Sequence, residues 1–256
     1  MSEGVTGQQD DAVLAAAIAT EAGRLLLQLQ ACGLFEDKAL GAAGDAVSQA
    51  FIAQALHVHR PLDAVLSEEA TGDLVRLERS RVWVVDPLDG TREYSERRTD
   101  WAVHVALSID GVAGPGAVAL PGLGLTLRTD QAPKPPAALD APPRMLVSRT
   151  RPAPQALAVA ERLGATLVPM GSAGAKAMAV VRGEADIYLH AGGQYEWDSC
   201  APVAVAQSAG LHVSRIDGAA CRYNSADPYM PDLLICRPEL ATRVLEAIGR
   251  DAAALS

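Results

Sequence analysis

The sequence predicts a mixed fold in two parts, an α+β half over residues 1–135 and an α/β half over residues 136–256. Two helical patterns and then a series of short strands occupy the first half, whereas strands and helices alternate through the second. The segment 131–143, Q-A-P-K-P-P-A-A-L-D-A-P-P, separates the halves because its prolines are incompatible with a regular element.

The composition favours a folded, acidic protein. Hydrophobic residues make up 49% of the chain, and the formal net charge of -9 argues against binding to the phosphate backbone of nucleic acids. The four cysteines lie far apart without metal-ligand spacing, which predicts reduced thiols. No apolar run approaches the length of a membrane span, and the acidic N-terminus is unlike a signal peptide. We therefore expect a cytoplasmic protein that binds neither nucleic acid nor membrane.

The first half begins with two predicted helices. Apolar residues recur at helical spacing over residues 12–30, where Asp10 or Asp11 is placed to cap the helix start, and again over residues 47–58. The loop between these helices, which includes A-G-D ending at Asp45, carries an acid in a polar turn.

Strands are predicted after the helices, at residues 64–67, 82–85, 101–109, 112–120 and 123–129. The strand at 82–85 should leave the sheet at Pro87, which has no N–H for a ladder hydrogen bond. Asp110-Gly111 is a strong hairpin turn signal, and His104 is predicted to be a hydrogen-bonded core histidine.

The second half alternates between the two kinds of element. Its predicted strands lie at residues 145–148, 166–168, 186–189 and 233–236. Its predicted helices lie at residues 155–163, 173–182, 201–209 and 239–248. This order is typical of α/β architecture.

The stretch 81–94, R-V-W-V-V-D-P-L-D-G-T-R-E-Y, places two carboxylates and a glycine directly behind an apolar strand. Asp86 lies at the strand end and the backbone turns over Gly90, so the Asp89 carboxylate, the Leu88 carbonyl and the Thr91 hydroxyl can converge on one point. Carboxylates this close repel each other unless a cation or proton neutralises them, and oxygen ligands favour magnesium, calcium or manganese over zinc. The stretch predicts a divalent-cation site, and an ordinary Asx-type turn is the alternative.

Further acids and one anion-binding signal lie elsewhere in the chain. Glu68 follows the strand at 64–67 much as Asp86 follows the next strand, although paired glutamates also occur in solvated turns. G-S-A-G-A-K, ending at Lys176, is a glycine-containing turn that opens a helix, which suits an anion but is also ordinary capping. Asp198 falls at a predicted helix N-cap, and Cys200 is predicted to be a buried small residue rather than a nucleophile.

Three motifs together resemble a known family. E-E after an apolar run, D-P-L-D-G-T at 86–91 and W-D-x-x-A-P at 197–202 match, in order and separation over nearly the whole chain, the magnesium-dependent, lithium-sensitive phosphomonoesterases typified by inositol monophosphatase. L-S-E-E at 66–69, S-R-T-R at 148–151 and G-S-A-G-A-K at 171–176 most resemble the CysQ branch, the 3'-phosphoadenosine 5'-phosphate phosphatases of sulfate assimilation. The resemblance implies a layered α-β-α-β-α sandwich of the inositol monophosphatase and sugar phosphatase type, usually dimeric.

The resemblance also implies roles for particular residues. Glu68, Asp86 and the Leu88 carbonyl would hold one Mg²⁺, and Asp86, Asp89 and Asp198 a second, with two or three ions in all. The catalytic residues would be Asp45, Glu68 and Thr91, with Asp45 and the Thr91 hydroxyl activating the attacking water. The segment 44–51 departs from the family pattern, because it lacks a basic residue and has Phe51 where the family has an acid.

Three functions remain open on these grounds. The first is a nucleotide 3'-phosphatase, the second is an inositol or fructose 1,6-bisphosphate phosphatase, and the third is a non-catalytic protein that binds a phosphorylated metabolite. For the first, the residues expected to contact substrate are Glu68, Leu88, Asp89, Gly90, Thr91, Ser148, Arg149, Gly171, Ser172, Lys176 and Asp198.

Overall fold

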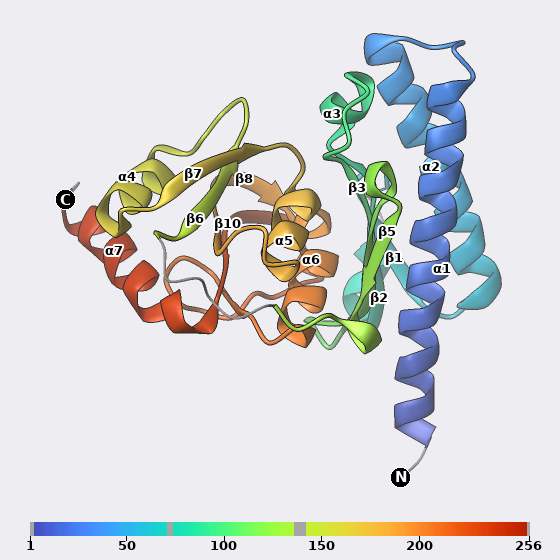
Figure 1. The fold of residues 1–256 in the computed structure, drawn as a ribbon. Coiled ribbons are helices and arrows are strands. Elements are labelled where there is room, and N and C mark those ends of the chain that lie inside the picture. The colour runs from blue at the N-terminus through green and yellow to red at the C-terminus, as the bar shows by residue number, and fades with distance from the viewer. Residues whose placement is uncertain (1–2, 71–73, 136–141, 255–256) are drawn as a thin grey trace.

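Two sheets and three layers of helices stack in alternation (Figure 1). The computed structural model describes residues 3–70, 74–135 and 142–254. From one outer layer through the centre to the other, the helices are α1 (Glu3–Ala31) and α2 (Asp37–His59), then α5 (Ala173–Val181) and α6 (Glu196–Ser208), then α4 (Pro154–Leu163) and α7 (Ala241–Ala254). The short helix α3 (Thr91–Ser95) lies at one end of the first sheet. The predicted α-β-α-β-α sandwich is confirmed.

The first sheet has five strands in the order β1-β2-β3-β4-β5. They are β1 (Ala64–Ser67), β2 (Arg81–Asp89), β3 (Ala102–Ile109), β4 (Val112–Leu120) and β5 (Leu125–Arg128). Only β1 and β2 run parallel, and the hairpin from β3 to β4 turns at Asp110 and Gly111, both with positive φ, as predicted. The 3-10 turns Leu74–Glu78, Pro121–Leu123 and Thr129–Gln131 flank these strands.

The second sheet has the order β7-β6-β8-β10-β9. Its strands are β6 (Arg144–Ser148), β7 (Thr166–Met170), β8 (Ile187–Tyr195), β9 (His212–Ser214) and β10 (Tyr229–Cys236). The strand β9 has no counterpart in the prediction, and β8 runs through Tyr195 rather than ending at Leu189. A 3-10 turn at Pro238–Leu240 precedes α7.

Strand β2 is buried on both faces, which explains its unbroken apolar sequence. Trp83 and Val85 pack into the core beneath α1 and α2, whereas Val82 and Val84 pack into the core shared with α5 and α6. This double burial fixes the register of the strand, because a shift by one residue would exchange the two cores. The acids that follow are therefore held at a defined end of the sheet.

The structure corrects three local predictions in the first half. Helix α2 begins at Asp37, so Asp45 lies within a helix and not in a loop. Asp11 does not cap α1, which begins earlier, and its buried carboxylate instead pairs with Arg60 at 2.7 Å and Arg81 at 3.0 Å. Strand β2 continues past Pro87 to Asp89, because a register shift between Asp86 and Asp89 accommodates the residue that cannot donate.

The expectation that no apolar run approaches membrane-spanning length was wrong. The segment Asp11–Ala31 of α1 is long and apolar enough to cross a membrane by length and composition alone. Ala15, Ala19 and Ala22 on this helix are fully buried in the core formed with the first sheet, and core helices of soluble proteins pass the same test.

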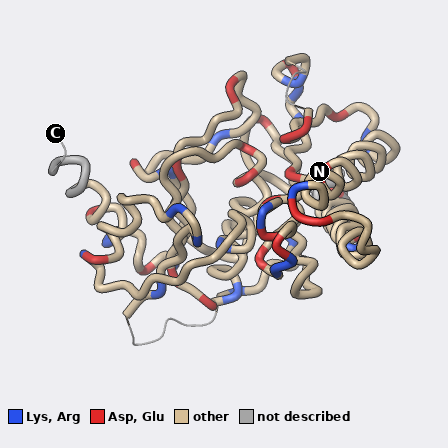
Figure 2. Tube along the Cα trace, turned by 90° about the horizontal axis from the view of Figure 1, so that it is seen from above, with Lys and Arg blue, Asp and Glu red and all other residues tan. Residues whose placement is uncertain are grey.

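Positive and negative residues are interspersed over the described part of the chain (Figure 2).

Each sheet is built from one predicted half, since β1–β5 precede residue 135 and β6–β10 follow it. The division itself stays a prediction, because residue 136 and the rest of segment 136–141 lie outside the described residues.

Gly44 lets α2 approach the end of β2, and this closeness can be tested. A Cβ atom on Gly44 would lie 2.8 Å from Tyr94 Cε1 and 3.0 Å from Leu88 Cδ2. We expect Gly44→Ala to lower the free energy of unfolding by about 1–3 kcal/mol through overpacking. The measurement is denaturant unfolding followed by circular dichroism.

Gly249 provides the matched control for this substitution. It lies in α7 with no atom within 4 Å of an added Cβ, so Gly249→Ala should stabilise the protein by up to about 1 kcal/mol through helix propensity. Equal effects of the two substitutions would contradict the close contact at Gly44.

Candidate metal centre

The end of β2 is shaped by its own local bonds. The Leu88 N–H donates to Asp86 Oδ1 at 3.0 Å across the proline, and Gly90 adopts the left-handed conformation with φ 87° before α3 begins. A side chain is poorly tolerated at that φ, so glycine is required for the turn. Asp86 and Asp89 consequently both project from the bulged end of the strand.

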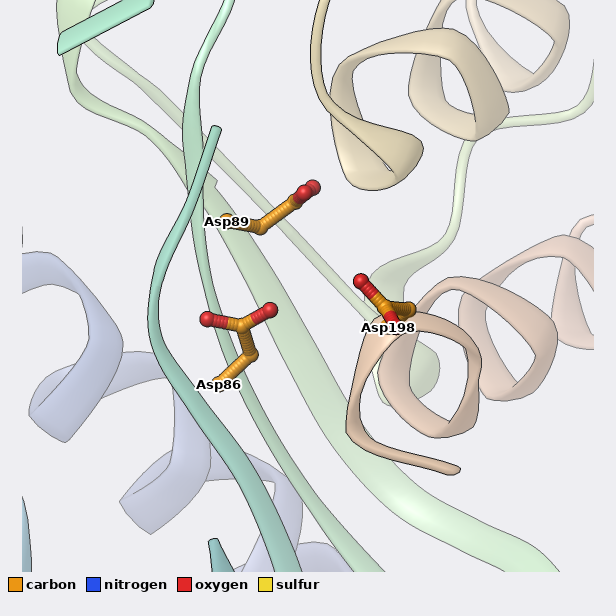
Figure 3. Close-up of side chains that lie close together, drawn as sticks. All are labelled: Asp86, Asp89 and Asp198. Carbon is orange, nitrogen blue, oxygen red and sulfur yellow. The ribbon is translucent and has the colours of Figure 1, made fainter. Parts of the chain in front are cut away.

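Three carboxylates meet at this point (Figure 3). Asp86, Asp89 and Asp198 each offer an oxygen atom, and these atoms lie within 4.8 Å of one another. Asp198 comes from the first turn of α6, where its Oδ2 accepts a hydrogen bond from the Tyr195 N–H at 2.7 Å. The N-cap is Tyr195 and not Asp198, which corrects the predicted position while keeping a capping contact.

The start of α5 binds an anion, as the glycine-containing turn suggested, but the anion is Asp89. Its carboxylate accepts hydrogen bonds from Ser172 Oγ, from the Ala173 N–H at 3.1 Å and from the Gly174 N–H at 2.6 Å. Ser172 has an unusual positive φ of 49°, which aims its hydroxyl at Asp89. This contact joins residues 86–91 of the first half, which we call the metal loop, to the second half.

His104 is a buried core histidine, as predicted, and it also touches the centre. Its Nε2 lies 3.2 Å from Asp89 Oδ2, and its Nδ1 lies 3.0 Å from the Trp197 carbonyl oxygen. The sequence prediction missed the contact with Asp89. Strand pairing places His104 opposite Asp86, and this register is the signal that could have located it.

The three carboxylates differ in how far neighbouring groups stabilise their negative charge. Burial alone would raise the pKa of Asp89, but His104 and the hydrogen bonds from Ser172 and Gly174 outweigh it and lower the pKa to about 2. Burial and the neighbouring acids Asp89, Glu68 and Asp198 raise the pKa of Asp86 well above its ordinary value. Burial and Asp89 raise the pKa of Asp198 to about 6.

Glu68 extends this acidic group at the end of β1. Glu68 is exposed and lies outside the three-carboxylate cluster found among the described residues. Desolvation and repulsion from Asp198 and Asp45 nevertheless raise its pKa to about 7. The oxygen-only donors and the excess negative charge fit a hard divalent cation.

Thr91 links the metal loop to α2. Its hydroxyl lies 3.2 Å from the Leu88 carbonyl oxygen and 3.4 Å from Asp45 Oδ1. Desolvation and repulsion from Glu69 raise the pKa of Asp45 to about 6, against the hydrogen bond from Thr91. The two residues expected to activate water therefore lie in contact.

The basic residues expected to contact substrate have other partners. Arg149 pairs with Glu93 at 3.0 Å and with Glu96 at 2.7 Å. Lys176 is buried and donates to the carbonyls of Gly171, at 3.2 Å, and Ser172, while burial lowers its pKa.

The remaining predicted substrate residues occupy less direct positions. Ser148 ends β6 and its hydroxyl accepts the Arg151 N–H at 3.2 Å. Gly171 donates its N–H to Asp100 at 2.7 Å, and an added Cβ there would collide with the buried Glu93. Sequence reasoning did not single out Glu93, because its importance comes from contacts between the two halves.

The chain belongs to the inositol monophosphatase family. The Inositol monophosphatase family profile matches residues 11–251, which confirms the family resemblance.

Similar proteins carry more specific names. A Mycobacterium leprae protein named 3'-phosphoadenosine 5'-phosphate phosphatase is 48% identical over 252 residues, covering 93% of each chain. A Mycobacterium tuberculosis protein of the same name is 49% identical over 239 residues, covering 90% of each chain. The 3'(2'),5'-bisphosphate nucleotidase CysQ of Escherichia coli is 29% identical over 199 residues, covering 73% of this chain and 81% of that protein. These likenesses confirm the predicted resemblance to the CysQ branch.

Solved structures show the same fold. CysQ from Bacteroides thetaiotaomicron superimposes with a TM-score of 0.78 at 24% identity, covering 90% of this chain and 97% of that one. Inositol monophosphatase II from Staphylococcus aureus superimposes with a TM-score of 0.80 at 20% identity, covering 94% of each.

Metal removal should have a pH-dependent effect on stability. Because the pKa values of Glu68 and Asp198 are raised to about 7 and about 6, their folded forms hold protons that the unfolded forms have released. Their unfavourable contribution to stability is absent below the unfolded pKa, grows as pH rises toward the folded pKa and is fully present above it. Mg²⁺ competes with these protons, so it should raise Tm more near pH 7.5 than near pH 5.5.

The measurement is the Tm difference between protein in Mg²⁺ and in EDTA at the two pH values. Taking the difference cancels the effect on Tm of titrating groups that are remote from the site. An equal Tm increase at both pH values would show that these carboxylates do not bind the ion.

Proposed function

We propose that the chain is a magnesium-dependent phosphatase that removes the 3'-phosphate of 3'-phosphoadenosine 5'-phosphate, releasing adenosine 5'-phosphate and inorganic phosphate. The observation that carries the phosphatase chemistry is the convergence of Asp86, Asp89 and Asp198 from the two halves within 4.8 Å. The choice of substrate is supported by relatives of that name at 48% and 49% identity.

The residues proposed to hold the metal supply oxygen atoms alone. Two or three Mg²⁺ ions would be bound by Glu68, Asp86, the Leu88 carbonyl, Asp89 and Asp198. Asp198 belongs to residues 136–256 and the others to residues 1–135, which we treat as the two parts of the protein. When bound, the ions would lower the pKa of a water and neutralise the phosphoryl oxygens. Asp86 is proposed to serve both ions, since it is the most deeply buried of the uncompensated acids.

Asp45 and Thr91 are proposed to prepare the attacking water. The water oxygen would bond to phosphorus as the bond to the 3'-oxygen breaks, and the leaving oxygen would take up a proton from solvent. Asp45, with a pKa of about 6, is largely ionised at neutral pH and can accept the proton that the water loses. The Thr91 hydroxyl, fixed near Asp45 and the Leu88 carbonyl, would orient that water.

Substrate recognition is proposed to involve both halves. Gly90 and Thr91 would bind the transferred phosphate, and Ser148, Arg149, Gly171, Ser172 and Lys176 would contact the second phosphate and the ribose. Arg149 is still partly exposed, so its guanidinium can exchange Glu93 and Glu96 for a phosphate. Lys176 would reach substrate only by leaving the carbonyls of Gly171 and Ser172.

The proposal has three further parts that follow from the family resemblance. We propose a homodimer, inhibition by lithium, and action in the cytoplasm on a small phosphorylated substrate rather than on nucleic acid or at a membrane.

Asp86→Asn should separate stability from activity. Without metal, the substitution removes repulsion from Asp89 and Asp198, so the Tm in EDTA should stay unchanged or rise. Turnover should fall by at least about 10³-fold, because positioning and charge stabilisation supply most of the rate in phosphoryl transfer. Phosphate release and thermal unfolding are the two measurements, and near wild-type turnover in the folded variant would refute the site.

The substrate is tested by phosphate release with Mg²⁺, in EDTA, and with Mg²⁺ plus lithium. We expect 3'-phosphoadenosine 5'-phosphate to react fastest, with adenosine 5'-phosphate accumulating as the product, and the reaction to stop in EDTA. Preference for inositol 1-phosphate or fructose 1,6-bisphosphate would keep the phosphatase and overturn the nucleotide assignment. Release from none of them would favour a binding protein.

A further inference from the structure

A buried polar network joins the two halves beside the metal centre. Arg76, in the 3-10 turn after β1, is 1% exposed, and Glu196, the first residue of α6, is also 1% exposed. Between them lies the loop that contains Asn224 and Ser225. Two opposite charges are thus enclosed where the first half meets the second, and neither belongs to the proposed metal-ligand set.

The loop is bound from both sides. Arg76 Nη1 donates to Asn224 Oδ1 at 2.7 Å and Nη2 donates to the Ser225 carbonyl at 2.8 Å. On the other side, the Glu196 carboxylate accepts the Asn224 N–H at 2.5 Å and the Ser225 N–H at 2.8 Å. The Asn224 side chain returns a bond from Nδ2 to the Arg76 carbonyl at 3.0 Å.

Asn224 has the right chemistry for this position. Its φ of 63° is in the left-handed region, which asparagine tolerates better than most residues. Its carboxamide both accepts from and donates to Arg76, so one side chain fixes the turn and connects it to the first half.

One end of the network is next to a proposed metal ligand. Glu196 precedes Asp198 by two residues in the first turn of α6, and its N–H is held by the Pro228 carbonyl at 2.8 Å. At the other end, Arg76 belongs to the first half, which contributes Asp86 and Asp89. Movement of the loop would therefore change the position of Asp198 relative to Asp86.

We propose that Arg76, Asn224 and Glu196 are positioning residues that set the separation of the metal ligands contributed by the two halves. The proposal rests on the proposed metal-dependent function. The network ties the start of α6, which carries Asp198, to Arg76 in the first half, so it limits how far Asp198 can move from Asp86 without adding an acid to the centre.

Three substitutions at two residues test the network at different severities. Asn224→Gly keeps the left-handed backbone and the N–H donated to Glu196, but removes the side-chain bonds to Arg76. Arg76→Gln removes the buried charge, and Arg76→Lys keeps the charge with fewer bonds. Arg237→Gln is the matched control, because Arg237 is 4% exposed and pairs with Asp186 at 2.7 Å, just before β8 and at the opposite end of that strand from α6 and Asp198.

The readouts are Mn²⁺ binding to the substrate-free protein by electron paramagnetic resonance, Tm in EDTA, and the Mg²⁺ dependence of kcat. Asn224→Gly and Arg76→Gln should weaken Mn²⁺ binding by roughly 10- to 100-fold, and Arg76→Lys by less than Arg76→Gln. Arg237→Gln should lower Tm while leaving Mn²⁺ binding at the wild-type level.

The outcomes separate this inference from the proposed function. If the wild-type protein binds no Mn²⁺, the metal-dependent function fails and the inference fails with it. If wild-type protein binds Mn²⁺ and folded Asn224→Gly binds it as tightly as Arg237→Gln, the network is merely structural and only the inference is overturned. If Arg76→Gln does not fold, Asn224→Gly decides.

Discussion

Repulsion between closely spaced carboxylates is the constraint on which the rest of this structure depends. Asp86, Asp89 and Asp198 lie within 4.8 Å of one another in a place where water cannot screen them fully. Such a group separates unless the surrounding chain holds it together or a cation neutralises it. The fold provides the first of these by anchoring each acid to an element that is fixed by a large apolar core.

The sandwich brings two helix starts to the end of one strand. Helices α5 and α6 pack between the sheets, and the first turn of each lies beside the end of β2. Helix N-termini favour negative charge, so Asp89 binds the start of α5 and Asp198 occupies the first turn of α6. The central helix layer therefore packs both sheets together and partly stabilises the acids between them.

The sequence allowed the core strands and the pair of acids at the end of β2 to be predicted, because burial on both faces makes β2 an unbroken apolar run with its acids at the end. Other features depended on tertiary contacts that no local pattern records. The start of α2 was missed because two glycines interrupt its helical pattern, and they are needed for close approach to α3 and the core around Leu88. The contact of His104 with Asp89, and the pairing of Arg149 with Glu93, are set by strand register and by packing between the halves.

The acids of the centre differ in their need for a cation, and the difference follows from their partners. The charged form of Asp89 is already stabilised by His104, by Ser172 and by two backbone N–H groups, which keep it ionised well below neutral pH. For Asp86, the hydrogen bond from the Leu88 N–H lowers the pKa, but burial and several neighbouring charges raise it by more. The pKa of Glu68 is raised to about 7. The unmet demand for positive charge is therefore concentrated on the side of Asp86 and Glu68. A bound cation would relieve there the repulsion that, together with burial, raises the pKa of both groups.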